Sequence, residues 1–449
     1  MSPAARRILL SVAAIVVVAL LVGIWIIRGP GPLAFADGPK VPLADYRGAN
    51  PTGVPPALAQ ASLVERGAYL ARAADCMVCH TSKDGKPYAG GLGFRLPFGT
   101  LYSTNITPDK DTGIGNYSDQ DFLNAVHRGI RRDGARLYPA MPFPSYTYMT
   151  DADALAIKAY LFSLPAVRAP APENTLTFPF NQRWAMSFWS AVFNPDTRFE
   201  PDTSKSPEWN RGAYLAEALA HCGECHTPRN LAFALDNRKK FAGAVTAGWR
   251  AFNISSDKAT GVGGWRDEDL VSYLSIGHAD GHGTASGPMG EAVDHSLSHL
   301  APEDIRAVVA YLRTVPAIPS PDLPATLAPP APPSHRDGGG TPDPRGKMVF
   351  EGACVTCHDW TGQSPLSPLA TLTGAWAVND PSATNVAQVV ISGTKRHVPP
   401  DAISMPAFGN AYSDAEIAAV ANYVTARFGS KPSHLSAQDV ADLRAQASQ

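Results

Sequence analysis

The chain has 449 residues, of which 17% are charged, and a formal net charge of −2 at pH 7. A balance this close to neutral excludes the basic stripe expected of a nucleic-acid-binding protein. The length is that of about three domains, and the 41 prolines and 38 glycines predict much irregular backbone.

The N-terminal segment predicts a membrane anchor. Residues 8–27 form a run of 20 without a charge, and a helix of that length, rising about 1.5 Å per residue, spans a hydrocarbon core of roughly 30 Å. Arg6 and Arg7 precede the run, so the positive-inside rule places the N-terminus in the cytoplasm and the rest of the chain in the periplasm. The alternative is a signal peptide cleaved after Ala36, whose apolar region would ordinarily be shorter, about 7–15 residues. We predict a retained single-pass anchor and linker over residues 1–36, in the cytoplasmic (inner) membrane.

Cysteine and histidine recur three times in one spacing, Cys-x-x-Cys-His. The three copies use all six cysteines, so no further cysteine pair remains for a zinc site, and a redox dithiol would not need the histidine. Histidine directly after Cys-x-x-Cys is typical of c-type haem attachment, in which both thiols bond to the porphyrin and the histidine binds its iron. The sequence therefore predicts three covalently bound haem c groups, held by Cys76, Cys79, Cys222, Cys225, Cys354 and Cys357, with His80, His226 and His358 as iron ligands.

The first two motifs lie in duplicated units. The stretch RGAYLA precedes both motifs, at residues 66–71 and 211–216. Further along, NITPDKDTGIG (105–115) recurs as NISSDKATGVG (253–263), and AYLFSLPAV (159–167) as AYLRTVPAI (310–318). Landmarks repeated in the same order, at a spacing of roughly 145 residues, indicate a duplication. We predict one domain per motif, over residues 55–165, 206–318 and 345–430, and a C-terminal tail over residues 431–449.

Helices are expected at both ends of each domain. Each motif closes a short helix, such as residues 63–74. A final helix then begins at a capping-box-like pattern, Thr150 to Asp153 and Ser413 to Glu416, or at Pro302 followed by acidic residues. A first helix with the haem motif, packed against a last helix, is the layout of class I cytochrome c. The predicted fold is therefore mainly α: three tandem class I cytochrome c domains behind an N-terminal transmembrane helix.

The two connections between these domains differ in composition. Residues 316–344 contain ten prolines, which predicts a stiff Pro/Gly-rich linker over residues 319–344. The first connection, over residues 166–205, is aromatic and includes FPFNQRWAMSFWSAVF (178–193). Such a segment either packs across the seam between two domains or contacts a partner subunit, a quinone or the bilayer surface.

The second axial ligand of each iron separates an electron carrier from a catalyst, because carriers fill that position with Met or His. Met405 is the only methionine after the third motif, and Met289 is the only one between the second motif and the end of its domain. Met141 corresponds to Met289 in the repeat, whereas Met149 falls at the cap of the final helix. The predicted axial pairs are His80/Met141, His226/Met289 and His358/Met405. For the second iron His278, His282, His295 and His299 remain alternatives.

Several stretches together resemble a known family. They are RGAYLARAADCMVCHT, STNITPDKDTGIG, LYPAMPFPSY, HCGECHTPRN and MPAFGNAYSDAEIAAVANYV. Over about residues 60–430 the chain is similar to the triheme cytochrome c subunit of the membrane-bound, quinone-reducing dehydrogenases of acetic acid bacteria and their relatives. Those enzymes include alcohol, aldehyde, gluconate, sorbitol and fructose dehydrogenases.

The resemblance implies a division of labour. A separate dehydrogenase subunit of molybdopterin, pyrroloquinoline quinone or flavin type, in some cases with a small iron–sulfur subunit, oxidises the substrate. Electrons then pass through the three haems to ubiquinone, so no catalytic residue is expected in this chain. Alcohol and gluconate versions typically look signal-cleaved, and the long anchor here is closer to the cytochrome subunit of the aldehyde dehydrogenases.

Two other functions compete with this interpretation. One is a free-standing, membrane-anchored multihaem shuttle to a terminal oxidase. The other is a haem peroxidase, which needs an open or displaceable sixth ligand, and the three methionines argue against it.

Overall fold

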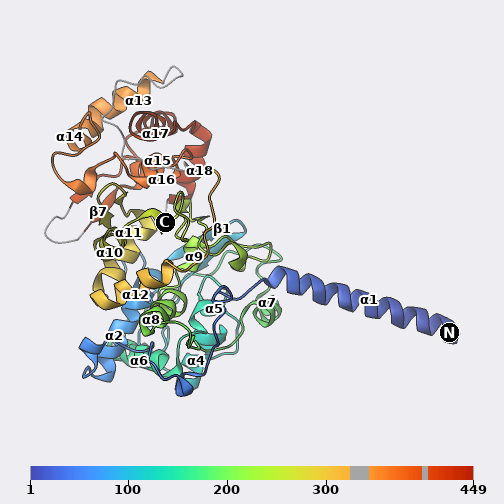
Figure 1. Ribbon diagram of the computed structural model, residues 1–449. Helices are drawn as coiled ribbons and strands as arrows, with labels where there is room; N and C mark the ends of the chain where they lie inside the picture. Colours follow the sequence, from blue (N-terminus) through green and yellow to red (C-terminus); the bar gives the residue numbers. More distant parts are fainter. Residues whose placement is uncertain (1, 324–342, 397–402, 448–449) are drawn as a thin grey trace.

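The computed structural model describes residues 2–323, 343–396 and 403–447, and its folded body consists mainly of helices (Figure 1). Within these described residues the named strands pair as four antiparallel hairpins of two strands each. Most of the Pro/Gly-rich linker predicted over residues 319–344 lies outside the described residues.

The predicted anchor is helix α1 (Pro3–Arg28), which stands away from the body of the molecule (Figure 1). Ser2 caps its N-terminus, proline occupies its first turn, and Gly29 ends it with a positive φ of 66°. Within the described residues it is the one helix long and apolar enough to cross a membrane. The helix is longer than the uncharged run because Arg6, Arg7 and Arg28 are good helix formers that extend it at both ends.

Three pairs of helices cross in the same way. They are α2 (Leu63–Ala73) with α6 (Asp151–Ser163), α8 (Pro207–Tyr214) with α12 (Pro302–Leu312), and α13 (Pro344–Val349) with α17 (Asp414–Phe428). Each pair defines one helical unit of the chain, called here the first, second and third unit.

A glycine at each crossing explains the close packing. A Cβ added at Gly67, Gly212 or Gly346 would lie 1.9, 1.8 or 2.2 Å from a carbonyl oxygen of the opposite helix. No side chain larger than hydrogen fits there without separating the helices. The glycine of RGAYLA is therefore a packing residue, and the third unit has its own equivalent although its sequence there is different.

The remaining elements are short. The other α-helices of the described residues are α3 (Cys76–Cys79), α4 (Asp119–Arg128), α5 (Phe143–Tyr146), α7 (Met186–Phe193), α9 (Gly223–His226), α10 (Asp267–Ile276), α11 (Gly287–His295), α14 (Val355–His358), α15 (Trp376–Asn379), α16 (Thr384–Ser392) and α18 (Ala437–Ala447). The hairpins are β1 (Gly93–Leu96) with β2 (Gly99–Tyr102), β3 (Ala244–Thr246) with β4 (Trp249–Ala251), β5 (His278–Ala279) with β6 (Gly283–Thr284), and β7 (Thr394–Arg396) with β8 (Ile403–Met405).

The duplication seen in the sequence is also present in the hydrogen bonds. The Asn105 side chain donates to the Val167 carbonyl oxygen over 2.6 Å, and Asn253 donates to the Ile318 carbonyl oxygen over the same distance. In both units this bond ties the middle landmark of the repeat to its third landmark, in the segment that follows the last helix.

The first two units are joined by matching hydrogen bonds. Tyr69 of α2 donates from its hydroxyl to Asp304 at the start of α12, over 2.6 Å. Its counterpart Tyr214 of α8 donates to Asp153 at the start of α6, over 2.5 Å. All four residues are buried, and the buried hydrophobic side chains of both units form one cluster.

The third unit has a separate hydrophobic cluster. The residues predicted as a C-terminal tail contribute to it, because α18 packs against α16 and α17 with Val440 fully buried. Ser436 and Asp439 cap the start of α18 by reciprocal hydrogen bonds, so the segment predicted as a tail contains a capped helix.

Candidate haem-binding sites

Each predicted motif lies on a short helical turn: α3, α9 and α14. Burial raises the pKa of the thiols, to about 12 for Cys76, Cys79 and Cys222 and to about 11 for Cys225 and Cys354. Thiols with such pKa values are protonated at neutral pH and differ from the thiolate of a redox-active dithiol. Among the described residues no group of three or more His, Cys, Asp or Glu side chains is arranged as a metal site. The donor set fits haem attachment better than zinc or dithiol chemistry.

The three motif histidines are oriented in the same way. The Nδ1 atoms of His80, His226 and His358 each lie 2.6 Å from a backbone carbonyl oxygen, of Thr104, Phe252 and Ala370 respectively. A carbonyl can only accept, so Nδ1 carries the proton and Nε2 keeps its lone pair for a metal. Burial also lowers the pKa of all three imidazoles, which favours the neutral form that binds iron.

The predicted methionine ligands share an environment that Met149 does not. Met141, Met289 and Met405 are partly exposed and lie at the edge of a hydrophobic cluster. Met149 is 1% exposed and belongs to the core. Met141 lies outside the helices and strands, Met289 in the first turn of α11 and Met405 in β8. Proline suits the first turn of a helix, which is why Pro288 does not prevent one.

Two of the alternative histidines have other partners. His278 lies 2.8 Å through Nδ1 from Thr284 Oγ1 and 3.1 Å through Nε2 from Asp280 Oδ1, so both ring nitrogens are engaged. His282 stacks on Trp265 with ring centroids 3.6 Å apart, and its Nε2 lies 3.7 Å from Asp269.

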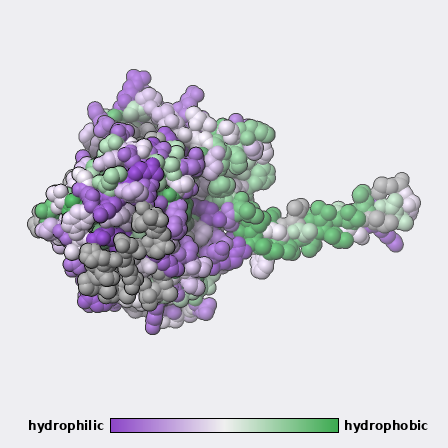
Figure 2. Space-filling view, turned by 90° about the horizontal axis from the view of Figure 1, so that it is seen from above, coloured by the Kyte–Doolittle hydropathy of each residue, from purple (hydrophilic) through white to green (hydrophobic). Residues whose placement is uncertain are grey.

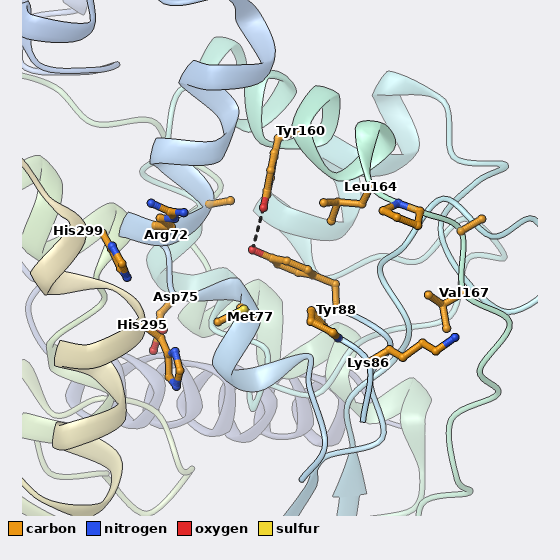
Figure 3. A pocket seen from close by; sticks show the side chains of 14 residues that line it. Arg72, Asp75, Met77, Lys86, Tyr88, Tyr160, Leu164, Val167, His295 and His299 are labelled. Atoms are coloured by element: carbon orange, nitrogen blue, oxygen red, sulfur yellow. Dashed lines mark hydrogen bonds between the residues drawn. The ribbon is translucent and has the colours of Figure 1, made fainter. Parts of the chain in front are cut away.

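The other two alternative ligands, His295 and His299, lie beside the first unit, on the side of the helix that carries its motif. They line a cavity of about 520 Å³ together with Arg72, Asp75 and Met77 of the first unit (Figure 3). The far wall holds Tyr88 and Tyr160, whose hydroxyls are 3.4 Å apart (Figure 3). This cavity joins residues more than 200 positions apart in the sequence, and sequence reasoning did not foresee it.

Asp75 is the unusual group of this cavity. Burial, and then the negative charge of Glu291 on α11, raise the pKa of the Asp75 carboxyl to about 8. The pKa of Glu291 is itself raised by burial. At neutral pH the Asp75 carboxyl therefore favours the protonated form, at the place where the first and second units meet.

The first and second motifs lie on the two sides of this seam. Tyr146 donates from its hydroxyl to the Ala74 carbonyl oxygen over 2.6 Å, and its ring lies 5.5 Å from that of His221, beside the second motif. Ser145 donates to Glu224, inside that motif, over 3.0 Å. Cys225 lies close enough to Cys79 to contribute to its raised pKa. The fold thus brings the first two sites together.

The third unit contacts the second beside its predicted iron ligands. Arg396 of β7, 1% exposed, donates to the carbonyl oxygens of Gly290 and Ile276 and pairs with Asp294 at 3.1 Å. Gly290 and Asp294 belong to α11, the helix that carries Met289. Arg396 therefore holds that helix in place.

A ring contact reaches the other ligand of the second site. Trp376 packs edge-on against Phe252, with centroids 5.5 Å apart, and the Phe252 carbonyl oxygen is the one that orients His226. The third unit thus supports both sides of the second site.

Comparisons with known proteins agree with this chemistry. The family model described as cytochrome c matches residues 64–165 and 344–428. The gluconate 2-dehydrogenase cytochrome c subunit of Pantoea cypripedii is 40% identical over 85% of this chain and 90% of its own. The fructose dehydrogenase cytochrome subunit of Gluconobacter japonicus is 38% identical over 88% and 86%. The cytochrome c subunit of a quinone alcohol dehydrogenase of Gluconobacter oxydans is 38% identical over 86% and 83%.

Proposed function

We propose that this chain, which belongs to the family of cytochrome c subunits of quinone-linked dehydrogenase complexes, carries electrons through three haem c groups from a dehydrogenase subunit to ubiquinone. Haem c supplies a one-electron centre when bound. The chain's own residues tether it, orient its iron ligand and keep neighbouring sites at fixed separation. Substrate oxidation is assigned to the partner subunit.

The observation that best supports a count of three haems is the repeated orientation of the motif histidines. His226 of the middle unit, which the family model does not cover, is held through Nδ1 at the same 2.6 Å as His80 and His358. Together with the glycine crossing at Gly212, this supports a third cytochrome c domain between the two matched regions.

The methionine pairs support an electron carrier. We propose Met141, Met289 and Met405 as the sixth ligands, because a His/Met pair raises the reduction potential and leaves no open site for peroxide. At the second site the competing histidines are engaged with other partners or lie at the first unit's cavity.

The structure around the possible cleavage site favours a retained anchor. Ala36 is 7% exposed within the shared core, and the Phe35 ring lies 6.0 Å from that of Tyr311. Lys40 just beyond forms an ion pair of 2.7 Å with buried Asp202. Cleavage after Ala36 would remove side chains that pack against the core. We therefore propose a single-pass protein of the inner membrane with its haem domains in the periplasm.

The substrate class is the finer part of the proposal. The long anchor in the sequence favours an aldehyde dehydrogenase as the partner, whereas the three relatives described above are subunits of gluconate, fructose and alcohol dehydrogenases. The alcohol dehydrogenase relative supports alcohol oxidation by the partner, which is of pyrroloquinoline quinone, flavin or molybdopterin type.

Purification from detergent-solubilised membranes tests the proposal. We expect the chain to co-purify with a dehydrogenase subunit, to retain three haems per chain after acid–acetone extraction, and to start before residue 37 by mass spectrometry. Reduction by the partner's substrate followed by reoxidation with a ubiquinone analogue identifies the acceptor. A chain that purifies alone and does not react with quinone would instead be a shuttle, and loss of any haem on extraction contradicts the covalent count.

A further inference from the structure

The C-terminal end of α1, where the proposed span leaves the membrane, is hydrogen-bonded to the surface of the second unit. Arg238 donates from Nη1 to the Ile26 carbonyl oxygen over 2.9 Å, and Asn230 donates to the Ile27 carbonyl oxygen over 3.0 Å. Asn237 reaches the Pro30 carbonyl oxygen at 3.2 Å. The bonds to Ile26 and Ile27 satisfy carbonyl groups that the end of a helix leaves without partners, and the guanidinium suits the negative end of the helix dipole. The point at which the span leaves the bilayer is therefore defined by the folded body.

Exposed apolar side chains surround this point. The aromatic connector contributes Phe178, Phe180, Trp184 and Phe188, which are 78, 43, 65 and 69% exposed, and the loop beside Asn230 contributes Leu231 and Phe233, at 96 and 46%. We call these six residues the exit surface. Helix α7, which carries Phe188, contacts α1 and lies beside its base in Figure 1. In the space-filling view, hydrophobic colouring continues from the helix onto the adjoining body (Figure 2).

Contacts with the underlying protein hold the residues of the exit surface in place. The Phe98 ring of the first unit stacks on Phe180 with centroids 4.0 Å apart and meets Phe233 edge-on at 5.5 Å. Trp189 donates from Nε1 to the Ala232 carbonyl oxygen over 2.7 Å, which joins the connector to the loop. Part of the connector therefore packs across the seam between the first two units, as one of the two sequence interpretations has it. The remaining aromatics are presented outwards by that framework.

We propose that the exit surface lies in the headgroup–acyl boundary of the bilayer leaflet from which α1 emerges. The exit surface is continuous with the transmembrane span. Residues fixed beside the end of a transmembrane helix lie at the depth of the membrane interface, so the lipid surface is the partner of this patch. Tryptophan and phenylalanine are favoured there, and exposed apolar groups gathered in one patch mark an interaction site. The proposal rests on the proposed anchoring by α1. It predicts that the haem domains sit against the membrane in one orientation.

Site-directed spin labelling of the full-length protein in vesicles tests this proposal. All six native cysteines are expected in thioether bonds, so an introduced cysteine is the reactive thiol. Phe188→Cys and Leu231→Cys probe the exit surface. Val17→Cys probes the middle of α1, and Leu366→Cys, on a 64% exposed leucine of the third unit, is the matched control. The vesicles contain phosphatidylethanolamine and phosphatidylglycerol, and the haems stay in the air-stable ferric state throughout, so that their effect on each label is the same with and without the added relaxant. Haem content checks the fold of each variant.

The readout is the accessibility of each nitroxide to oxygen relative to a water-soluble nickel complex. We expect the ratio at positions 188 and 231 to lie severalfold above that at 366 and below that at 17. Ratios at 188 and 231 equal to the ratio at 366, with a lipid-like value at 17, would overturn the exit-surface proposal and leave the anchor standing. A water-like value at 17 would instead show that α1 does not span the bilayer, and both proposals would fall.

Discussion

Replacing Gly212 with alanine should destabilise the second unit even though alanine is the better helix former. The exchange gains up to about 1 kcal/mol of helix propensity. The added Cβ, however, would lie 1.8 Å from the Ala307 carbonyl oxygen, about 1.6 Å short of the 3.4 Å at which ordinary contact begins. A backbone carbonyl cannot rotate away, so α8 and α12 must separate, and such overpacking costs about 1–3 kcal/mol or more. Because the clash is this severe we take the upper part of that range, about 2–3 kcal/mol. The net loss is then about 1–2 kcal/mol, which corresponds to a melting temperature lower by roughly 2–8 °C.

Thermal melting of the full-length haem protein, followed by circular dichroism, measures this loss. Gly67→Ala and Gly346→Ala should behave alike, because their added Cβ atoms would lie 1.9 and 2.2 Å from the Ala156 and Ala419 carbonyl oxygens. Gly352→Ala is the matched control, since it is helical and nothing lies within 4 Å of its added Cβ. The reasoning is wrong if Gly212→Ala melts at the same temperature as Gly352→Ala or above it.

Three further predictions concern the sites. Met289→Ala should keep its covalent haem, because the cysteines hold it, but lower the potential of the second haem in a redox titration; unchanged spectra and potentials would assign a histidine instead. Arg396→Met should leave the Asp294 carboxylate buried without its cation and cost about 3–5 kcal/mol, with a shifted second-haem potential that Arg396→Lys partly restores; a shift in melting alone would make Arg396 merely structural. The pKa of Asp75 is raised to about 8 from an ordinary 3.8. Between these two pH values the folded state keeps a proton on this carboxyl that the unfolded state releases. The stability that Asp75 contributes should therefore be fully present below about pH 4 and be lost as the pH rises to about 8. Asp75→Asn should flatten this dependence in denaturant titrations, and an unchanged slope would refute the assignment.

Local patterns of the sequence predicted local structure well. The uncharged run from residue 8 to 27 became the core of α1, and the pattern from Ser413 to Glu416 forms a reciprocal capping box. At Thr150 only half of the box forms: the Thr150 hydroxyl accepts from Asp153, whose carboxylate binds Tyr214 and the Gly53 amide instead. Tertiary contacts decided that cap.

The arrangement of the units could not be predicted in the same way. Tyr69 and Asp304, which join the first two units, are 235 positions apart, and in the sequence they look like ordinary residues of amphipathic helices. The cavity with His295 and His299 and the support of α11 by Arg396 likewise depend on how whole units dock. Such contacts leave no periodicity or spacing in the sequence.

The matching bonds of Tyr69 with Asp304 and of Tyr214 with Asp153 give the first two units the character of an isologous dimer fused into one chain. In such an arrangement each half presents the same patch to the other, so the interface itself favours neither direction of travel for an electron. Direction must come from whatever breaks the symmetry. Arg396 binds α11 of the second unit, and Arg238 holds the end of α1 on that same unit. The third unit and the membrane span are therefore both attached to the second unit, and these attachments distinguish it from the first.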